Sequence, residues 1–142
     1  MSSIREQILS TIVTVLNGAT VAGSNIFRER ETPISRDMVP AIVVTPEEET
    51  DRLINQLCNE CTLMVSIGIY TRGDPADQIA DPIATAMHTI LMTNHSILAL
   101  VIQVKKNSSK WEQHEADQTA GVLTMSYQFR YLHTVADITT IL

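Results

Sequence analysis

The sequence has few of the motifs on which catalytic and cofactor sites are usually built. Its five glycines show neither the GxGxxG spacing of a dinucleotide-binding loop nor the spacing of a phosphate-binding P-loop. It also contains no GxSxG nucleophile elbow and no HExxH metal-binding helix. Because nothing in the sequence specifies an active site, we expect that this protein is not an enzyme.

Basic residues and long apolar runs are also scarce. Ten Lys and Arg stand against sixteen Asp and Glu, which gives a formal net charge of −6. A protein that grips nucleic acid needs a basic patch, and no such excess is present. No apolar run approaches the roughly 20 residues of a membrane span, and the N-terminus lacks the features of a signal peptide. We therefore expect a cytosolic chain that neither enters a membrane nor holds DNA.

Only two cysteines are present, which is too few for a disulfide framework. Cys58 and Cys61 form a CxxC pair, which in other proteins is half of a zinc site or a redox centre. A structural zinc site needs four ligands, and the four histidines are scattered over different predicted elements: His88, His95, His114 and His133. We therefore expect two reduced thiols, no metal site and no cofactor.

Two segments have the periodicity of amphipathic helices. Residues 3–16 begin with a capping box formed by Ser3 and Glu6 and continue with apolar residues at helical spacing. Residues 74–91 begin with an Asp-Pro start signal and keep one apolar stripe throughout. Because a proline inside a helix costs on the order of 3 kcal/mol, we expect a kink or a restart at Pro82.

Five segments have the apolar character or the alternation of strands: 25–30, 41–45, 61–71, 98–105 and 122–133. Pro46 is expected to end the second strand, and residues 134–142 are expected to form a loosely ordered tail. The order α-β-β-β-α-β-β predicts an α+β fold for the single domain 1–142. We expect a mixed, mostly antiparallel sheet of about five strands with two helices packed on one face.

One predicted loop is unusually long for a connection between two strands. Residues 107–121 span fifteen positions, whereas hairpin loops usually have about two to five residues. This segment carries the only tryptophan, Trp111, between Lys110 and Glu112. Tryptophan is a typical interface anchor. The alternatives are a mobile hairpin tip or a tryptophan folded back onto the core.

The charges are distributed in opposite groups along the chain. In these groups the acidic residues are Glu47, Glu48, Glu49 and Asp51, and the basic residues lie elsewhere, at Arg28, Arg30, Arg36, Lys105 and Lys106. Opposite patches on one subunit suit a head-to-tail interface that forms a ring. The alternative is that each group is simply a solvated face.

From Asn25 to Val44, a short strand, a Thr-Pro turn and a Pro-Ala-Ile-Val-Val strand follow the N-terminal helix. The segment from Trp111 to Tyr131 combines an acidic loop with a long final strand. In both segments the chain resembles tail-terminator proteins of long-tailed phages, the minor tail protein U-like family. The segment from Cys58 to Cys61 departs from the family's pattern.

The resemblance implies a structural virion protein. Such proteins form rings, commonly hexamers, that stack on the last ring of the tail tube and stop its polymerisation. The other face of the ring receives a head-completion protein, and DNA passes through the lumen without specific binding. The implied partners are further copies of the chain, the tail tube protein and the head-completion protein. The implied location is the virion tail, after assembly in the bacterial host cytoplasm.

Three alternatives remain open at the level of the sequence. The first is a head–tail connector or completion subunit, which shares the coarse pattern. The second is a small cytosolic ligand-binding α+β protein. The third is an enzyme that uses Cys58 or Cys61.

Overall fold

The computed structural model describes residues 2–28, 39–73, 75–114 and 120–141. Within these ranges the helices are α1 (Ile4–Leu16), α2 (Ala76–Thr93) and α3 (His95–Leu98). The strands are β1 (Ile26–Arg28), β2 (Ala41–Leu53), β3 (Cys58–Arg72), β4 (Gln103–His114), β5 (Ala120–Thr134) and β6 (Asp137–Ile141). No described helix is long and apolar enough to cross a membrane.

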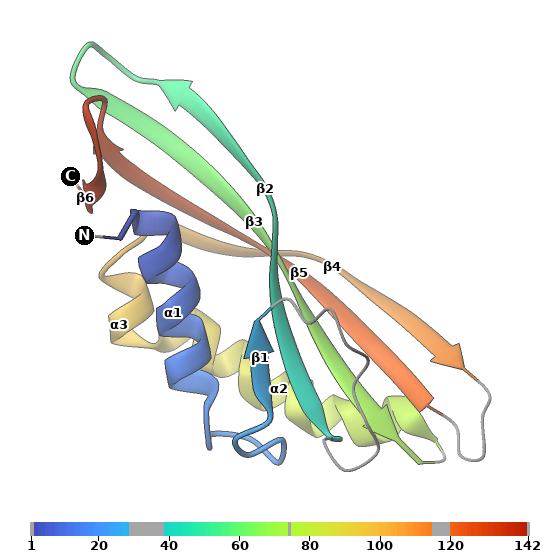
Figure 1. Cartoon of the computed structure of the whole chain (residues 1–142). Helices are drawn as coiled ribbons and strands as arrows, with labels where there is room; N and C mark the ends of the chain where they lie inside the picture. The colour runs from blue at the N-terminus through green and yellow to red at the C-terminus, as the bar shows by residue number, and fades with distance from the viewer. Residues whose placement is uncertain (1, 29–38, 74, 115–119, 142) are drawn as a thin grey trace.

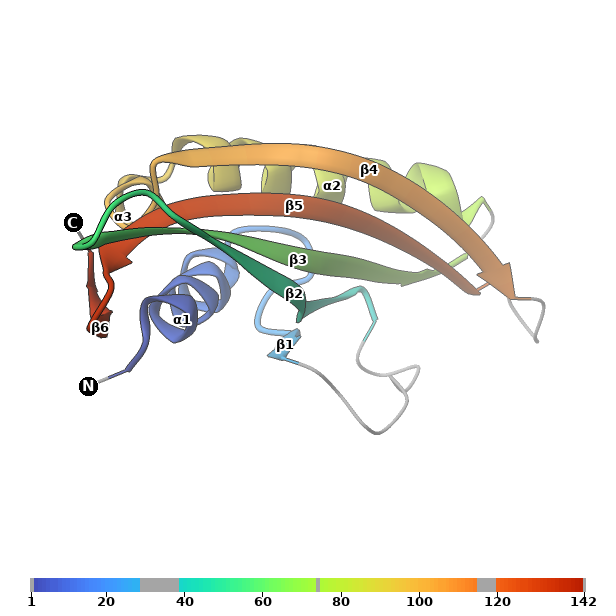
Figure 2. The same ribbon diagram turned by 90° about the horizontal axis from the view of Figure 1, so that it is seen from above.

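The strands form one sheet in the order β1-β2-β3-β5-β4, with β6 paired to β5. The β1–β2 pair is parallel, and the other pairs are antiparallel. The four long strands twist strongly and give the sheet an elongated, curved shape (Figures 1 and 2). The predicted α+β class, with a mixed and mostly antiparallel sheet, is therefore confirmed.

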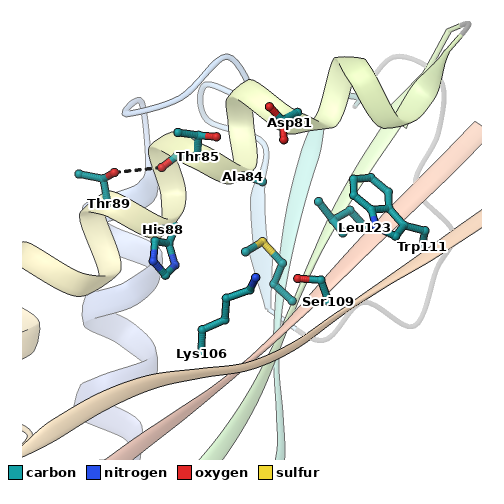
Figure 3. A pocket seen from close by; sticks show the side chains of 10 residues that line it. Asp81, Ala84, Thr85, His88, Thr89, Lys106, Ser109, Trp111 and Leu123 are labelled. Atoms are coloured by element: carbon teal, nitrogen blue, oxygen red, sulfur yellow. Dashed lines mark hydrogen bonds between the residues drawn. The ribbon is translucent and has the colours of Figure 1, made fainter.

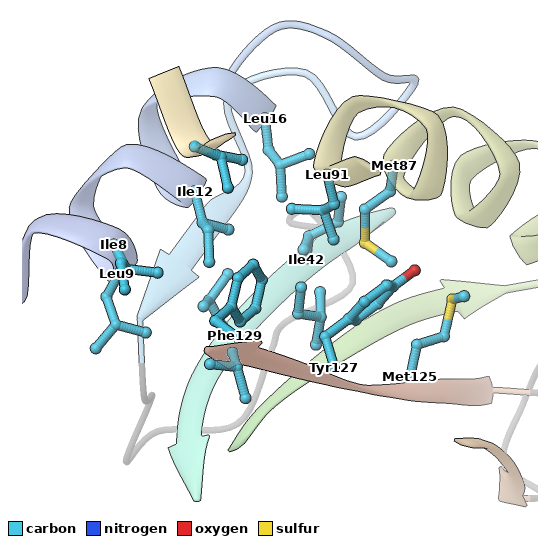
Figure 4. Close-up of a cluster of buried hydrophobic side chains, with 14 of the residues drawn as sticks. Ile8, Leu9, Ile12, Leu16, Ile42, Met87, Leu91, Met125, Tyr127 and Phe129 are labelled. Carbon is cyan, nitrogen blue, oxygen red and sulfur yellow. The ribbon is translucent and has the colours of Figure 1, made fainter. Parts of the chain in front are cut away.

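The core lies between the helices and one face of the sheet. Strict alternation along β5 places Leu123, Met125, Tyr127, Phe129 and Tyr131 on that face, where all five are buried. Apolar residues of α1 and α2 pack in the same cluster, and Figure 4 shows several of them around the rings of Tyr127 and Phe129. The apolar face formed by every second residue of β5 thus packs against the apolar stripes of the two helices, as the sequence predicts.

The helices follow the prediction except at the proline. The Ser3 hydroxyl accepts a hydrogen bond from the Glu6 amide across 3.2 Å, which caps α1. Helix α2 continues through Pro82 without a break, so the expected restart is not seen. Its N-cap is Pro75, and Asp74 lies outside the described residues. Helix α3 was not predicted.

Pro46 does not end the second strand, contrary to prediction. Strand β2 continues to Leu53, with an irregular register between Pro46 and Glu48. A proline is tolerated at such a bulge or on an edge strand because no ladder hydrogen bond is required of its nitrogen. The acidic group 47–49 consequently belongs to a strand and not to a connection.

The predicted loop at 107–121 is also wrong for most of its length. Strand β4 runs to His114 and β5 begins at Ala120, with Trp111 paired to Leu123. The prediction failed because residues 107–112 of this edge strand are exposed and, apart from Trp111, polar, so that they lack apolar alternation. Leu98, which was assigned to a strand, ends α3 instead. The hairpin tip at 115–119 lies outside the described residues.

The first predicted strand and the C-terminal tail also differ from the prediction. The strand expected at 25–30 is described only as β1, because residues 29–38 lie outside the described ranges together with the predicted Thr-Pro turn. The expected loose tail contains β6, which pairs with the end of β5.

Candidate functional site

Two long strand edges have no partner strand among the described residues. Strand β1 covers the outer edge of β2 only at Ile42, Val43 and Val44, so residues 45–53 remain open. At the other end of the sheet, β4 pairs with β5 alone. An open edge presents backbone N–H and C=O groups to which another strand can bind.

The open edge of β2 is acidic. Glu47 and Glu48 are exposed, and neither has an ion pair within the described part of the chain. Glu49 lies 3.6 Å from Arg5 of α1, measured between carboxylate and guanidinium, and is therefore held within the subunit. Of the predicted acidic group, Glu47 and Glu48 are thus the two that are available to a partner.

The open edge of β4 is basic. Lys105, Lys106 and Lys110 are all exposed on this strand. Lys110 and Glu112 form an ion pair with each other across 3.4 Å, whereas Lys105 and Lys106 form no ion pair with any described residue.

The acidic and basic edges lie at the same level of the sheet. Glu48 pairs with Met64, Met64 with Gln128, and Gln128 with Lys105. Directly paired residues share one face of a sheet. Glu48 and Lys105 are therefore the two ends of one row of side chains that crosses the sheet on the face opposite the core.

Arg28, the other predicted basic residue, is engaged within the chain. Its guanidinium donates to both carboxylate oxygens of Glu6 on α1, with 3.1 Å between Nη2 and Oε2. This hydrogen bond is the main reason that the pKa of Glu6 lies below its ordinary value. The glutamate therefore binds Arg28 instead of the Ser3 amide that the capping box predicts.

A cleft of about 320 Å³ lies between α2 and strands β4 and β5 (Figure 3). Asp81 and His88 line it from α2, and Lys106 and Trp111 line it from β4. His88 Nδ1 lies 2.8 Å from the hydroxyl of Tyr127, whose pKa burial raises to about 12. Trp111 is 52% exposed, so it forms a wall of this cleft and is not a lid folded onto the core.

A polar cluster occupies one end of the core face. It joins Asp51 of β2, Cys61 of β3 and His133 of β5, whose donor atoms all lie within 4.8 Å of one another. The Cys61 thiol donates to Asp51 Oδ1 across 2.7 Å. Burial and this hydrogen bond raise the pKa of Cys61 to about 12.

Sequence reasoning missed this cluster because it considered Cys58 and Cys61 as a pair. Residues three apart in a strand point to opposite faces, so the two thiols do not converge. The registers bring different residues together: Asp51 stands opposite Cys61, and His133 stands opposite Asn59. Asp51 and Cys61 could have been placed opposite each other if β2 and β3 had been recognised as a hairpin with a turn near residues 54–57. Because the sequence predicts that the second strand ends at Pro46, Asp51 was not considered as part of a strand.

The same end of the molecule carries an apolar surface that the sequence analysis also missed. Leu53 and Leu57 at the β2–β3 turn are 66% and 76% exposed, and Val135 and Ile138 beside the β5–β6 turn are exposed as well. The Val135 amide donates to the Leu57 carbonyl across 2.9 Å, which ties the two turns together (Figure 1). Exposed apolar groups of this kind are common at protein interaction sites.

No protein-family model and no curated protein matches this chain.

Proposed function

We propose that this protein is a structural subunit that forms a ring by pairing sheet edges, and that the ring caps the tail tube of a long-tailed phage. The observation that carries the proposal is the row of paired residues that ends in Glu48 on one open edge and in Lys105 on the other.

The row predicts how two copies meet. Strands β2 and β4 run in opposite directions within the subunit, because three antiparallel pairings separate them. If β4 of one copy joins β2 of the next, the new pair is antiparallel and Lys105 stands beside Glu48. Backbone hydrogen bonds then supply affinity, while the ion pair fixes the register.

The contact is head-to-tail, since it uses two different surfaces of each subunit. Repeated head-to-tail contacts form a closed ring when the rotation between neighbours closes, and a filament when it does not. The curvature of the sheet (Figure 2) supplies a rotation from one copy to the next. A ring, a hexamer in the proposed family, is the closed product that we expect.

The assignment to a tail tube is supported by the resemblance in element order and by the charge of the chain. A net charge of −6 per subunit suits a lumen through which DNA must slide without adhering. The proposed partners are further copies of the chain, the tail tube protein and the head-completion protein, and the proposed location is the virion tail.

Exchange of the two edge charges tests ring formation. Glu48→Lys and Lys105→Glu should each lower the ring mass measured by light scattering, because like charges then meet across the edge. The chain with both substitutions should recover the ring, since the pair is complementary again. Thr93→Lys, which adds a positive charge at the exposed C-terminal end of α2 and outside both strand edges, is the control. An unchanged ring mass in both single variants, or a double variant that remains a monomer, would contradict edge pairing.

Capping is tested separately by adding the assembled ring to polymerising tail tubes of its phage. Tubes should stop growing, and the ring should be found at one tube end by electron microscopy. If preformed rings leave tube growth unchanged but bind the head vertex, the head–tail connector function replaces the terminator function.

A second candidate function is binding of a small molecule, which the cleft beside α2 supports. Its volume of about 320 Å³ lies at the lower limit of known ligand pockets. Because Trp111 is the only tryptophan, its fluorescence reports directly on this cleft. A chain that stays monomeric at all concentrations, and whose tryptophan emission responds to a metabolite at micromolar concentration, would favour this function over the ring.

A further inference from the structure

We propose that Asp51, Cys61 and His133 form a binding site for a thiophilic divalent cation of the Zn²⁺ type, which fastens β2, β3 and β5 together at the apolar end of the sheet. The site is independent of the edge pairing described above, because it lies on the other face of the sheet and needs only one copy of the chain.

The donor set is that of a zinc site. It offers one carboxylate oxygen, one sulfur and one imidazole nitrogen, all within 4.8 Å of one another. Around Zn²⁺, with bonds of about 2.0 to 2.3 Å, tetrahedral ligands lie roughly 3.3 to 3.8 Å apart. Side-chain shifts of about 1 Å therefore suffice to close the three ligands around a metal ion.

His133 is already oriented as a metal ligand. Its Nδ1–H donates to the backbone carbonyl of Thr134 across 2.6 Å, so the lone pair is on Nε2, which faces the cluster. Histidines that bind metals are usually held in this way by a hydrogen bond from the other ring nitrogen. The side chain is buried, so its position is fixed by the surrounding sheet.

Asn59 marks the place that a cation would take. Its amide nitrogen lies 3.4 Å from Asp51 Oδ1, 3.6 Å from Cys61 Sγ and 3.3 Å from His133 Nε2. The Asn59 nitrogen is thus within 3.6 Å of all three candidate ligand atoms, and a cation that took its place would contact all three at once. Asn59 is only half-buried, and the proposed site requires its side chain to turn away.

The chemistry selects the metal. Thiolate and imidazole ligands favour Zn²⁺ and Co²⁺, whereas Mg²⁺ and Ca²⁺ prefer oxygen ligands throughout. On binding, the Cys61 proton passes to solvent and the thiolate sulfur forms the metal bond. The fourth ligand position is that of the displaced Asn59 amide and is open to water, because Asp51 is exposed.

Titration of the metal-free, reduced chain with Co²⁺ tests the site. We expect one equivalent to bind, with a thiolate-to-cobalt charge-transfer band in the near ultraviolet and the intense visible bands of a tetrahedral ion. Zn²⁺ should remove both signals by competition, and excess Mg²⁺ should not. A wild-type chain without the charge-transfer band would overturn the proposal.

Matched variants assign the ligands. Cys61→Ser should abolish the charge-transfer band, while Cys58→Ser, which removes the other thiol, should retain it. His133→Gln should lower Co²⁺ affinity by about tenfold or more. The opposite pattern, with Cys58 required and Cys61 dispensable, would overturn the assignment. If circular dichroism shows that Cys61→Ser is unfolded, the Co²⁺ affinities of His133→Gln and Asp51→Asn test the ligand assignment instead.

Asn59→Ala separates a metal site from a hydrogen-bond network. Since the amide is displaced on binding, the alanine variant should bind Co²⁺ at least as tightly as the wild type does. A loss of affinity comparable to that of His133→Gln would contradict displacement. The outcome bears on the metal alone, because ring formation is measured separately through Glu48 and Lys105.

Discussion

The two cysteines differ in environment although only two residues separate them. Cys61 is fully buried on the core face of β3, where its thiol donates to the carboxylate of Asp51 and its sulfur accepts a hydrogen bond from the phenol of Tyr131. Cys58 is half-buried and points to the opposite side of the strand. Strand periodicity therefore gives the two thiols different chemical properties.

This difference predicts selective modification. In the metal-free protein, iodoacetamide at pH 8 should alkylate Cys58 well before Cys61, because burial excludes the reagent and the pKa of Cys61 is raised to about 12. Mass spectrometry of the peptides measures both rates. In guanidinium chloride the two thiols should react alike. Equal rates in the folded protein would show that Cys61 is not enclosed by the sheet.

At the scale of elements, α2 shows how packing overrides a local signal. Pro82 lies on the exposed side of the helix, while its neighbours Ile83 and Ala84 are buried against the sheet. The helix spans Ala76–Thr93 and keeps this apolar contact on both sides of the proline. Tertiary contacts therefore keep the helix continuous across a proline at which the sequence predicted a kink or a restart.

Replacement of this proline should stabilise the protein. A proline in a helix interior costs about 3 kcal/mol, and its stiffening of the unfolded chain returns up to about 1 kcal/mol. Pro82→Ala should thus raise the free energy of unfolding in urea by about 2 kcal/mol. Thr85→Ala, an exposed change in the same helix, should give only a few tenths. A lower stability for Pro82→Ala would mean that the proline shapes the helix for packing.

Strand β4 shows the reverse case, in which a polar sequence forms regular structure. From Asn107 to Glu112 every side chain is exposed, and the strand is held by its backbone ladder with β5. Polar and charged residues on an edge strand also discourage indiscriminate pairing. The charges on β4 thus have two effects in the proposed ring. They favour pairing with the acidic edge of β2, and they discourage pairing with other strands.

At the scale of the whole molecule, the residues that carry stability differ from those that we propose for assembly. The buried cluster under α1 and α2 carries the apolar burial, whereas the two open edges carry exposed charges and Trp111. Substitutions in these two regions should therefore be separable in experiment.

Two aromatic substitutions test this separation. Phe129 is 0% exposed, and Phe129→Ala should lower the free energy of unfolding by about 3 to 5 kcal/mol. Trp111 is 52% exposed on the edge, and Trp111→Ala should cost less than about 2 kcal/mol but should weaken the proposed ring. Urea unfolding at low protein concentration measures stability, and light scattering measures assembly. If Trp111→Ala unfolds the chain as readily as Phe129→Ala does, the edge belongs to the core.

Much of the fold was predictable because it depends on local periodicity. The alternation from Leu123 to Tyr131 and the helical stripe from Ile4 to Leu16 specify which side of each element is buried. Two strand segments without such a pattern were not predicted, namely β2 beyond Pro46 and β4 beyond Lys106. Both are edge regions with mostly exposed side chains, so their sequences show no alternation of apolar and polar residues.

By itself the sequence determined the α+β class, the core face of β5, the two main helices and the opposite charge of the groups around Glu48 and Lys105. Only the tertiary structure decided that these two residues end one row across the sheet, and that Cys61 meets Asp51 and His133 rather than Cys58. The physical reason is strand register. Periodicity is a property of neighbouring residues, whereas register follows from how distant strands pair to bury a common face.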